Sequence, residues 1–562
     1  MLESLGRLWL AGVEIDWQGF YEHERRNRVP LQTYPFERQR FWIEPRARTL
    51  PPASDDTATV KKVNLAAWFY LPSWKPSLPP RAVAELRNNW LVLLDEGEVG
   101  KALAARLAAL DRNVVTVEMG ESFSRRSETS YTIRPTFVED YKDLLKDLQG
   151  SGWTPQAIVH AFSLTPLVVK NHGVGEFERA QEQGFYSLLA LLQALSLLSN
   201  EEIELAVVSN SVVATSAAES LSPEKSTMLA LCQVAAQESP NLTTRFIDLK
   251  MPEPAAVFSV DHLVNSLVTE LSAAHTDAVV AYRGRDRYVQ SFEPVFPDDG
   301  PGVTPLREQG VYLLTGGLTG NGFAVAKYLA RTVKARLVLL EREPVSDTDP
   351  RFQRLALLNE SGAEVCLVVA DVADESQLAR AWLEGETRFG VIHGVIHAEE
   401  PSGERAFRAI LEASREDCAP HFKAKAHAVY AFEKVLKDRE LDFCVLLSSV
   451  AAVLGGVGYG PYAAANLFMD SFVRNLNQTN LAPWLSLNCD LWLSEDSHEQ
   501  LTDVRADLSE LAMTAREGEE VFRRALAARS AGQLIVSTVD LPARLLETQK
   551  RFAGHRERRK NE

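Results

Sequence analysis

The sequence predicts an α/β protein built from two tandem doubly wound parallel sheets. Apolar, β-branched runs alternate with helical segments, a pattern typical of parallel strands covered on both faces. Two segments, beginning at Trp90 and Val311, both fit the order strand, glycine turn and helix: WLVLLDEGEVGKALAARLAAL and VYLLTGGLTGNGFAVAKYLAR. Further matches follow in the same order at similar spacing, so the chain contains an internal repeat.

The repeat rests on three pairs of segments. IVHAF matches VIHAE, and LAVVSNS matches CVLLSSV, while the glycine turns supply the third pair. The offsets are 221, 237 and 239 residues, so both order and spacing are kept. General likeness among α/β proteins is the alternative explanation.

The length and amino-acid composition limit the kinds of protein that this chain can be. The 562 residues predict about two to four domains, and 46% hydrophobic with 24% charged residues is typical of a soluble globular chain. The net charge of −16 argues against binding to nucleic acid or anionic membranes. Five scattered cysteines predict no metal site and a reducing, cytoplasmic compartment. The N-terminus is not a signal peptide, and the apolar run 185–198 predicts a buried helix.

The composition suggests four regions. Residues 1–50, ending VPLQTYPFERQRFWIEP, precede a linker, TLPPASDDTATV, and a second break, FEPVFPDDGPGVTPLREQG, lies near 292–310. We therefore expect a first half at 62–295, a second half at 305–545 and a charged tail at 546–562.

The two halves differ in chemistry. The turn of the first half, DEGEVG, carries three acids where phosphates would sit. The first half has SPEKSTMLALCQVAAQE where the second half has Tyr462. We therefore expect the first half to be structural and the second to hold the active site.

The turn TGGLTGNG lies directly between an apolar strand and a helix. Its glycines let the backbone approach a pyrophosphate, and the helix N-terminus offers unpaired N–H groups. A tight turn without a ligand is the alternative. The expected cofactor-binding residues here are Thr315, Gly316, Gly317, Gly320 and Gly322.

Acidic and basic residues follow the next two strands. Glu341 suits the ribose 2′-hydroxyl of NAD, and Arg342 suits the 2′-phosphate of NADP, so the cofactor choice is ambiguous. Asp371, in VVADVAD, suits either adenine or the cap of the next helix.

A serine and a tyrosine flank a glycine-rich loop in SSVAAVLGGVGYGPYAAAN. Pro461 precedes Tyr462 at the start of a helix, and Asn466 lies one turn on, on the same face. The loop lets Ser449 converge with Tyr462, so that two hydroxyls bind a carbonyl oxygen and the phenol donates a proton as hydride arrives. A phenol needs a nearby cation to lower its pKa; Lys425 is the candidate, and Lys423 its local competitor.

These motifs resemble a modular polyketide synthase ketoreductase, a relative of the short-chain dehydrogenases/reductases. The second half resembles the catalytic, Rossmann-like subdomain; the first, with IVHxxS and SPEK, resembles the truncated structural one. LQTYPFERQRFWIE resembles the linker after an acyltransferase domain. By this resemblance Ser449, Tyr462, Lys425 and Asn466 are catalytic. Further cofactor-binding positions are Arg342, Asp371, Val372, His397 and Ala398.

The resemblance implies reduction by NADPH, with NADH as an alternative, of a β-ketoacyl thioester on an acyl carrier protein. The implied partners are that carrier and other synthase domains. The sequence departs from the family at several points. Glu399 and Glu400 replace Ala-Gly beside the nicotinamide ribose, and Glu341 replaces a Ser beside the 2′-phosphate. Thr319 stands at a glycine position of the turn, with Gly320 restoring a related form.

The family's marks of product stereochemistry are absent. The segment that would carry Leu-Asp-Asp reads PSGERAF, and Leu454 stands where one class has Trp. Two alternative functions follow from the departures: a redox-inactive homologue with a structural role, and an epimerase that keeps the proton chemistry without hydride transfer. An unrelated dehydrogenase is a further alternative.

Overall fold

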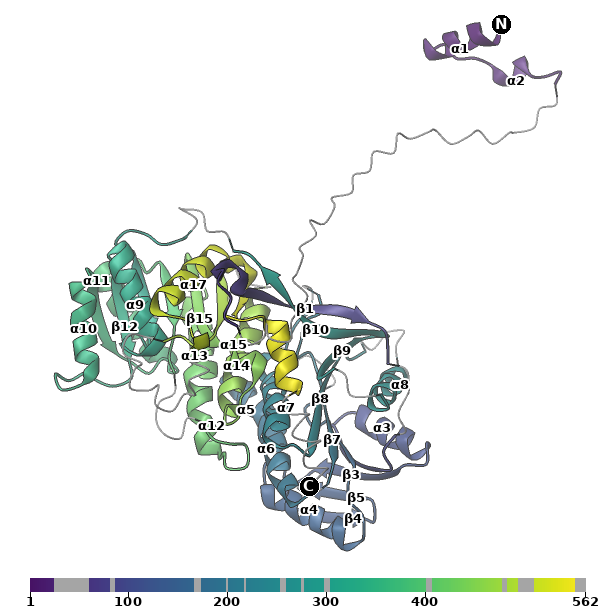
Figure 1. The fold of residues 1–562 in the computed structure, drawn as a ribbon. Coiled ribbons are helices and arrows are strands. Elements are labelled where there is room, and N and C mark those ends of the chain that lie inside the picture. The colour runs from purple at the N-terminus through teal and green to yellow at the C-terminus, as the bar shows by residue number, and fades with distance from the viewer. Residues whose placement is uncertain are drawn as a thin grey trace. The chain divides into compact units, whose positions relative to one another are not determined.

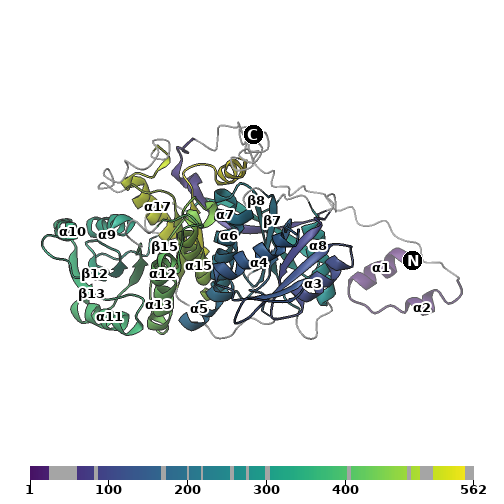
Figure 2. The ribbon, with the colours of Figure 1, turned by 90° about the horizontal axis from the view of Figure 1, so that it is seen from below.

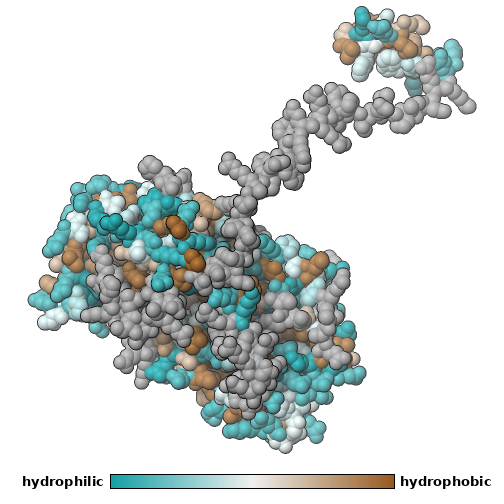
Figure 3. Space-filling view, in the orientation of Figure 1, coloured by the Kyte–Doolittle hydropathy of each residue, from teal (hydrophilic) through white to brown (hydrophobic). Residues whose placement is uncertain are grey.

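The structure is a computed structural model that describes residues 1–24, 60–80, 86–165, 173–198, 201–216, 219–252, 259–273, 277–297, 304–400, 407–477, 483–493 and 510–550. The chain divides into two compact units, Met1–Ser54 and Asp55–Glu562. The first unit contains α1 (Leu2–Leu10) and α2 (Trp17–Phe20), and its exposed apolar side chains include leucines of α1; brown areas are visible on this unit in Figure 3. The segment LQTYPFERQRFWIE and residues 551–562 of the expected tail lie outside the described residues.

The described strands of the second unit form one 17-stranded sheet, shown in Figures 1 and 2. Following the paired neighbours, its order is β4-β5-β3-β2-β6-β7-β8-β9-β10-β1-β17-β16-β15-β14-β11-β12-β13. The strands are β1 (Phe69–Ser77), β2 (Asn89–Leu93), β3 (Asn113–Met119), β4 (Ser124–Ser127), β5 (Ser130–Ile133), β6 (Ala157–His160), β7 (Ile203–Asn210), β8 (Leu242–Leu249), β9 (Val279–Arg283), β10 (Asp286–Val295), β11 (Val311–Thr315), β12 (Arg336–Glu341), β13 (Glu364–Val369), β14 (Gly394–His397), β15 (Phe443–Ser449), β16 (Trp484–Cys489) and β17 (Gln533–Val536).

The sheet confirms the predicted α/β class with parallel strands. The parallel order β3-β2-β6-β7-β8 in the first half is repeated as β12-β11-β14-β15-β16 in the second. Helix α10 connects β12 to β13, whereas a short antiparallel pair, β4 and β5, follows β3. Antiparallel strands β10 and β1 join the two parallel regions, because β1 pairs with both β10 and β17.

The helices cover this sheet, and two of them pack together between the halves. Helix α7 lies along α15, and one hydrophobic core contains buried residues from both halves. The described helices of the second unit include α3 (Val99–Ala108), α4 (Val138–Gly150), α5 (Val174–Gln183), α6 (Phe185–Ala194), α7 (Thr227–Glu238), α8 (Val260–Leu271), α9 (Gly320–Val333), α10 (Pro350–Glu360), α11 (Glu375–Phe389), α12 (Arg415–Phe422), the π-helix η5 (Lys423–His427), α13 (Ala428–Leu436), α14 (Ala451–Leu454), α15 (Gly460–Leu476) and α17 (Ala515–Ala527).

Several sequence expectations are refined. The apolar run 185–198 begins with the buried helix α6, as predicted, and the described helices include none long and apolar enough to cross a membrane. The expected break near 292–310 overlaps β10, which continues to Val295 because it pairs with β1 along its length. Helix α15 begins at Gly460, so Tyr462 lies within its first turn.

Candidate active site

The glycine-rich turn between β11 and α9 is shaped by close contacts. A Cβ at Gly322 would lie 2.2 Å from the carbonyl oxygen of Gly316, and one at Gly317 would lie 2.8 Å from a side chain of β12. Gly316 also has a φ of +65°, which favours glycine. At Gly320 nothing lies within 4 Å of the Cβ position, and the Thr319 side chain does not cap α9. There is therefore free space beside Gly320 at the start of α9, which fits a diphosphate.

His397, the last residue of β14, forms hydrogen bonds that hold neighbouring segments of the site together. Its Nε2 lies 2.9 Å from the carbonyl oxygen of Ala424, and its Nδ1 lies 2.7 Å from Thr315 Oγ1. Burial lowers its pKa to about 3, so the imidazole is neutral. Because a carbonyl only accepts, Nε2 carries the proton and Nδ1 accepts from the hydroxyl. The Ala398 N–H donates to the same Thr315 oxygen (3.3 Å), so these three predicted cofactor-binding residues also support one another.

The structure brings together the serine, tyrosine and lysine expected at one point. Ser449 is the last residue of β15, and its hydroxyl lies close enough to Tyr462 to act against the rise in the phenol pKa. Lys425 is buried, with Nζ 5.6 Å from the centre of the Tyr462 ring. Lys425 lies in the π-helix η5, and such wide turns are frequent at functional sites. Its competitor, Lys423, instead pairs with Asp371 (2.6 Å) at half-exposed positions.

Asn466 lies one turn after Tyr462 and is buried. Its Nδ2 donates to the Tyr462 carbonyl at 2.9 Å. Its Oδ1 is buried with no hydrogen-bond partner within the described part of the chain. An unpaired buried acceptor is costly, so this oxygen is suited to a water or a ligand donor.

Glu400 changes the electrostatics expected for the phenol. Its carboxylate lies 3.0 Å from Lys425 Nζ. Burial raises the pKa of Tyr462 well above its ordinary value, and the negative charge of Glu400 raises it further. The expectation that Lys425 lowers the phenol pKa is therefore wrong for this structure. The physical reason is that Glu400 compensates the ammonium charge and itself opposes ionisation of the phenol.

Glu399 engages the arginine expected to bind a 2′-phosphate. Arg342 Nε pairs with Glu399 Oε1, and only 14% of the Glu399 side chain is exposed. Burial raises the pKa of Glu399 to about 6, although Arg342 opposes the shift. The neighbouring Glu341 is buried and pairs with Arg351 (2.8 Å), so its charge is also compensated within the protein.

The remaining predicted residues lie after β13. Asp371 accepts from the Ala373 N–H at 3.1 Å, and hydrogen bonding to Lys423 helps to lower its pKa against the effect of burial. The cap of α11 is supplied by Asp374, so the capping role considered for Asp371 is wrong. Val372 is buried.

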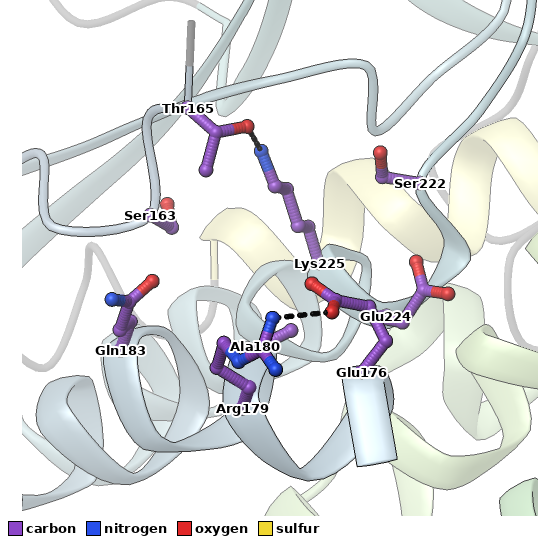
Figure 4. Close-up of a pocket in the computed structure, with 9 residues that line it drawn as sticks. All are labelled: Ser163, Thr165, Glu176, Arg179, Ala180, Gln183, Ser222, Glu224 and Lys225. Carbon is purple, nitrogen blue, oxygen red and sulfur yellow. Dashed lines mark hydrogen bonds and ion pairs between the residues drawn. The ribbon is translucent and has the colours of Figure 1, made fainter. Parts of the chain in front are cut away.

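The corresponding centre of the first half is occupied by its own side chains. Asp95 accepts from the N–H groups of Gly97 (3.0 Å) and Gly100 (2.6 Å), so a carboxylate lies at the start of α3, near the place corresponding to the diphosphate site. Beyond β6 and β7, the Lys225 ammonium donates to Thr165 (2.8 Å) and to an asparagine of β7 (2.7 Å). Figure 4 shows Lys225 pointing to Thr165.

The internal repeat extends to hydrogen bonds. His160 contacts Ser187 (2.6 Å) 27 residues later, as His397 contacts Ala424. By this alignment Leu188 occupies the position of Lys425, so the first half has no cation at that position.

Sequence reasoning missed a buried carboxyl group behind the site. Asp470 on α15 accepts from Ser486 (2.5 Å) and Asn488 (2.6 Å), and burial raises its pKa to about 6. An acid on the buried face of an alanine-rich helix was the signal available in the sequence. The structure shows no group of three or more His, Cys, Asp or Glu side chains within its described residues that suits a metal ion.

Comparisons with known proteins bear on this arrangement. Residues 310–494 match the family described as KR domain, and residues 88–270 match the one described as Beta-ketoacyl synthase-like, N-terminal. The polyketide synthase PksM of Bacillus subtilis is 27% identical over 545 residues, covering 94% of this chain but 12% of that protein. Polyketide synthase GfsA of Streptomyces halstedii is 26% identical over 600 residues, with 96% of this chain and 8% of that protein covered. The chain therefore spans about a tenth of the length of these relatives.

Solved structures share the fold. A ketoreductase from the macrolactin assembly line superposes with a TM-score of 0.71 at 22% identity, covering 85% of this chain and 92% of that one. The chain therefore has a Rossmann-like α/β fold. Residues 310–494 are similar to the KR domain family, and the chain as a whole is similar to part of several polyketide synthases, as the sequence motifs indicated.

Proposed function

We propose that this chain reduces a β-ketoacyl thioester, held on an acyl carrier protein, with NADPH. The observation that carries the proposal is the convergence of the Ser449 and Tyr462 side chains above the buried Lys425. The nearby glycine turn has free space beside Gly320 at the start of α9, which supports binding of the cofactor diphosphate there.

The side chains divide the chemistry between them. The Ser449 and Tyr462 hydroxyls bind the ketone oxygen, and the phenol transfers its proton to that oxygen. Its raised pKa keeps the phenol protonated, which is the form that donates, but makes it a weaker acid. Lys425 would favour proton release once its charge is no longer compensated by Glu400. When bound, NADPH supplies the hydride.

Cofactor choice depends on Arg342. Freed from Glu399, this guanidinium would pair with a 2′-phosphate, which favours NADPH over NADH. Thr315, Gly316 and Gly322 would line the diphosphate. The carrier-bound substrate and the neighbouring synthase domains are inferred from relatives named polyketide synthases. A cytoplasmic location is part of the proposal, and the five cysteines, all buried and unpaired, suit a reducing compartment.

The test is a titration of the purified chain with NADPH and NADH, followed by turnover of a simple β-keto thioester. We expect saturable NADPH binding and a hydroxyacyl product. If neither nucleotide binds at about millimolar concentration, where binding is worth only about 4 kcal/mol, the reductase proposal is wrong.

A redox-inactive homologue is the second candidate. Two ion pairs favour this function. Arg342, expected to bind the cofactor phosphate, pairs with Glu399, and Lys425, expected to act on the Tyr462 phenol, pairs with Glu400. An epimerase would retain the proton chemistry of Tyr462. Exchange of the substrate α-hydrogen for deuterium without nucleotide would identify it; a chain inactive in every assay would support a structural role.

A further inference from the structure

The end of α7, in the first half, reaches the active site of the second half. Glu238, the last residue of α7, accepts two backbone hydrogen bonds: from the Ile410 N–H to Oε2 at 2.6 Å and from the Gly458 N–H to Oε1 at 2.8 Å. Ile410 belongs to the segment 407–413, and Gly458 to the segment 454–459. We call these two segments the entrance loops, because they precede α12 and α15 and flank Tyr462.

The entrance loops meet above the tyrosine. A Cβ at Gly458 would lie 3.8 Å from backbone atoms of Phe407 and Arg408. The Phe407 ring lies 4.7 Å from that of Tyr459 and 5.5 Å from that of Tyr462. Phe407 and Tyr459 are nevertheless partly exposed, so together the loops present an apolar rim beside the phenol.

Two further contacts tie the same helix to the same loops. Gln237 Nε2 donates to the Leu454 carbonyl at 2.7 Å, and its side chain lies where a Cβ at Gly455 would fall. A Cβ at Gly460 would lie 3.3 Å from Leu231 of α7. The loop that delivers Tyr462 therefore rests on α7 at three points.

The location of Glu238 is electrostatically unfavourable unless its contacts compensate. A carboxylate at a helix C-terminus opposes the helix dipole, and burial together with the nearby Glu412 raises the pKa of Glu238. The two backbone N–H groups act in the opposite direction by stabilising the charged form. Both donors come from the entrance loops, so the acid is satisfied only when both loops are in place.

We propose that Glu238 is a positioning residue that locks the entrance loops together and thereby sets the Tyr462 phenol against the substrate carbonyl. The effect on turnover rests on the proposed reductase function, whereas the effect on the loops does not. One carboxylate bridging two segments fixes their separation, and small displacements of an acid group from its substrate reduce rates strongly.

The test compares Glu238→Gln with the wild-type chain by amide hydrogen exchange and steady-state kinetics. The amide has one acceptor oxygen, so it can keep one loop bond but faces the other N–H with a donor. We expect exchange in the peptides containing Ile410 and Gly458 to quicken about tenfold or more. We expect kcat to fall about 10- to 100-fold, with NADPH affinity unchanged within about twofold.

Glu182→Gln is the matched control. Glu182 also joins the halves, but its ion pair is with Arg415 of α12 and not with a residue of an entrance loop. It should leave exchange and kcat at wild-type values. Should Glu238→Gln fail to fold, Gln237→Ala tests the same support, with faster exchange at 454–459 and a smaller loss of kcat.

The two proposals fail separately. Unchanged exchange at Ile410 and Gly458 in Glu238→Gln overturns the positioning role whatever the activity. Faster exchange with unchanged kcat overturns the link between the loops and Tyr462. A wild-type chain without turnover overturns the reductase function, while loop exchange still decides whether Glu238 holds the entrance loops.

Discussion

Replacing Glu400 by Gln removes one negative charge from the immediate surroundings of Lys425 and Tyr462. At the observed 3.0 Å, a pair of unit charges is worth about 1.4 kcal/mol in water and about 5.5 kcal/mol at an effective dielectric constant of 20. The Glu400 side chain is 41% exposed, so solvent screening places the value near the lower limit.

Removing an ion pair worth about 1.4 kcal/mol that competes with the nucleotide corresponds to a factor of ten in the dissociation constant of the nucleotide. If NADPH must take Lys425 from Glu400, Glu400→Gln should bind the nucleotide about tenfold more tightly. The same change removes a cause of the raised Tyr462 pKa, so the alkaline limb of the kcat–pH profile should move to lower pH.

The assay is a fluorescence titration with NADPH at fixed ionic strength, followed by kcat against pH. Glu360→Gln, an exposed acid at the end of α10, changes net charge equally and should leave both quantities unchanged. Equal or weaker NADPH binding by Glu400→Gln would refute the reasoning, because it would mean that the carboxylate does not compete with the cofactor.

Further predictions follow from the same contacts. Tyr462→Phe should abolish turnover and leave NADPH affinity nearly unchanged; equal loss of both would contradict its role as proton donor. The pKa of Glu399 is raised to about 6, so protonation as pH falls from 7.5 to 5.5 should free Arg342 and increase the preference for NADPH over NADH. The measurement is the ratio of the NADH and NADPH dissociation constants as a function of pH. Glu399→Gln should remove the part of this pH dependence that Glu399 causes, while the part caused by protonation of the NADPH 2′-phosphate itself should remain. The pKa of His397 is lowered to about 3 from 6.5, so the unfolded chain binds the extra proton first. Above about pH 6.5, the His397 ring is neutral in both states and does not reduce the free energy of unfolding. Below that pH, its protonation in the unfolded chain lowers the free energy of unfolding by about 1.4 kcal/mol per pH unit. Urea unfolding at pH 7 and pH 5 should show the decline, and His397→Gln should reduce it.

The sequence predicted the strands and turns best where the pattern was local. The glycine turn before α9 and the apolar run that forms β15 were located from a few neighbouring residues, because strand burial and helix starts have short-range signatures. The joining of both parallel regions through β1 was not predicted. That strand pairs with β17 more than 450 residues later, and no local periodicity encodes such a pairing.

The residue types of the candidate site could be predicted from the sequence, but the ion pairs between its charged residues could not. Ser449 and Tyr462 were identified from their spacing around a flexible loop, and the fold brings them close together. The role of α7 was not visible, because Glu238 meets Gly458 across 220 residues of sequence.

By itself the sequence determined the α/β class, the repeated order of strands and the side chains available for proton transfer. Those properties follow from the period of apolar residues and from chemical identity, which a linear chain already contains. Only the tertiary structure decided that Lys425 rather than Lys423 lies beneath the phenol, and that Glu400 compensates its charge. Electrostatic interactions depend on distance and burial, and both are set when segments far apart in the sequence pack together.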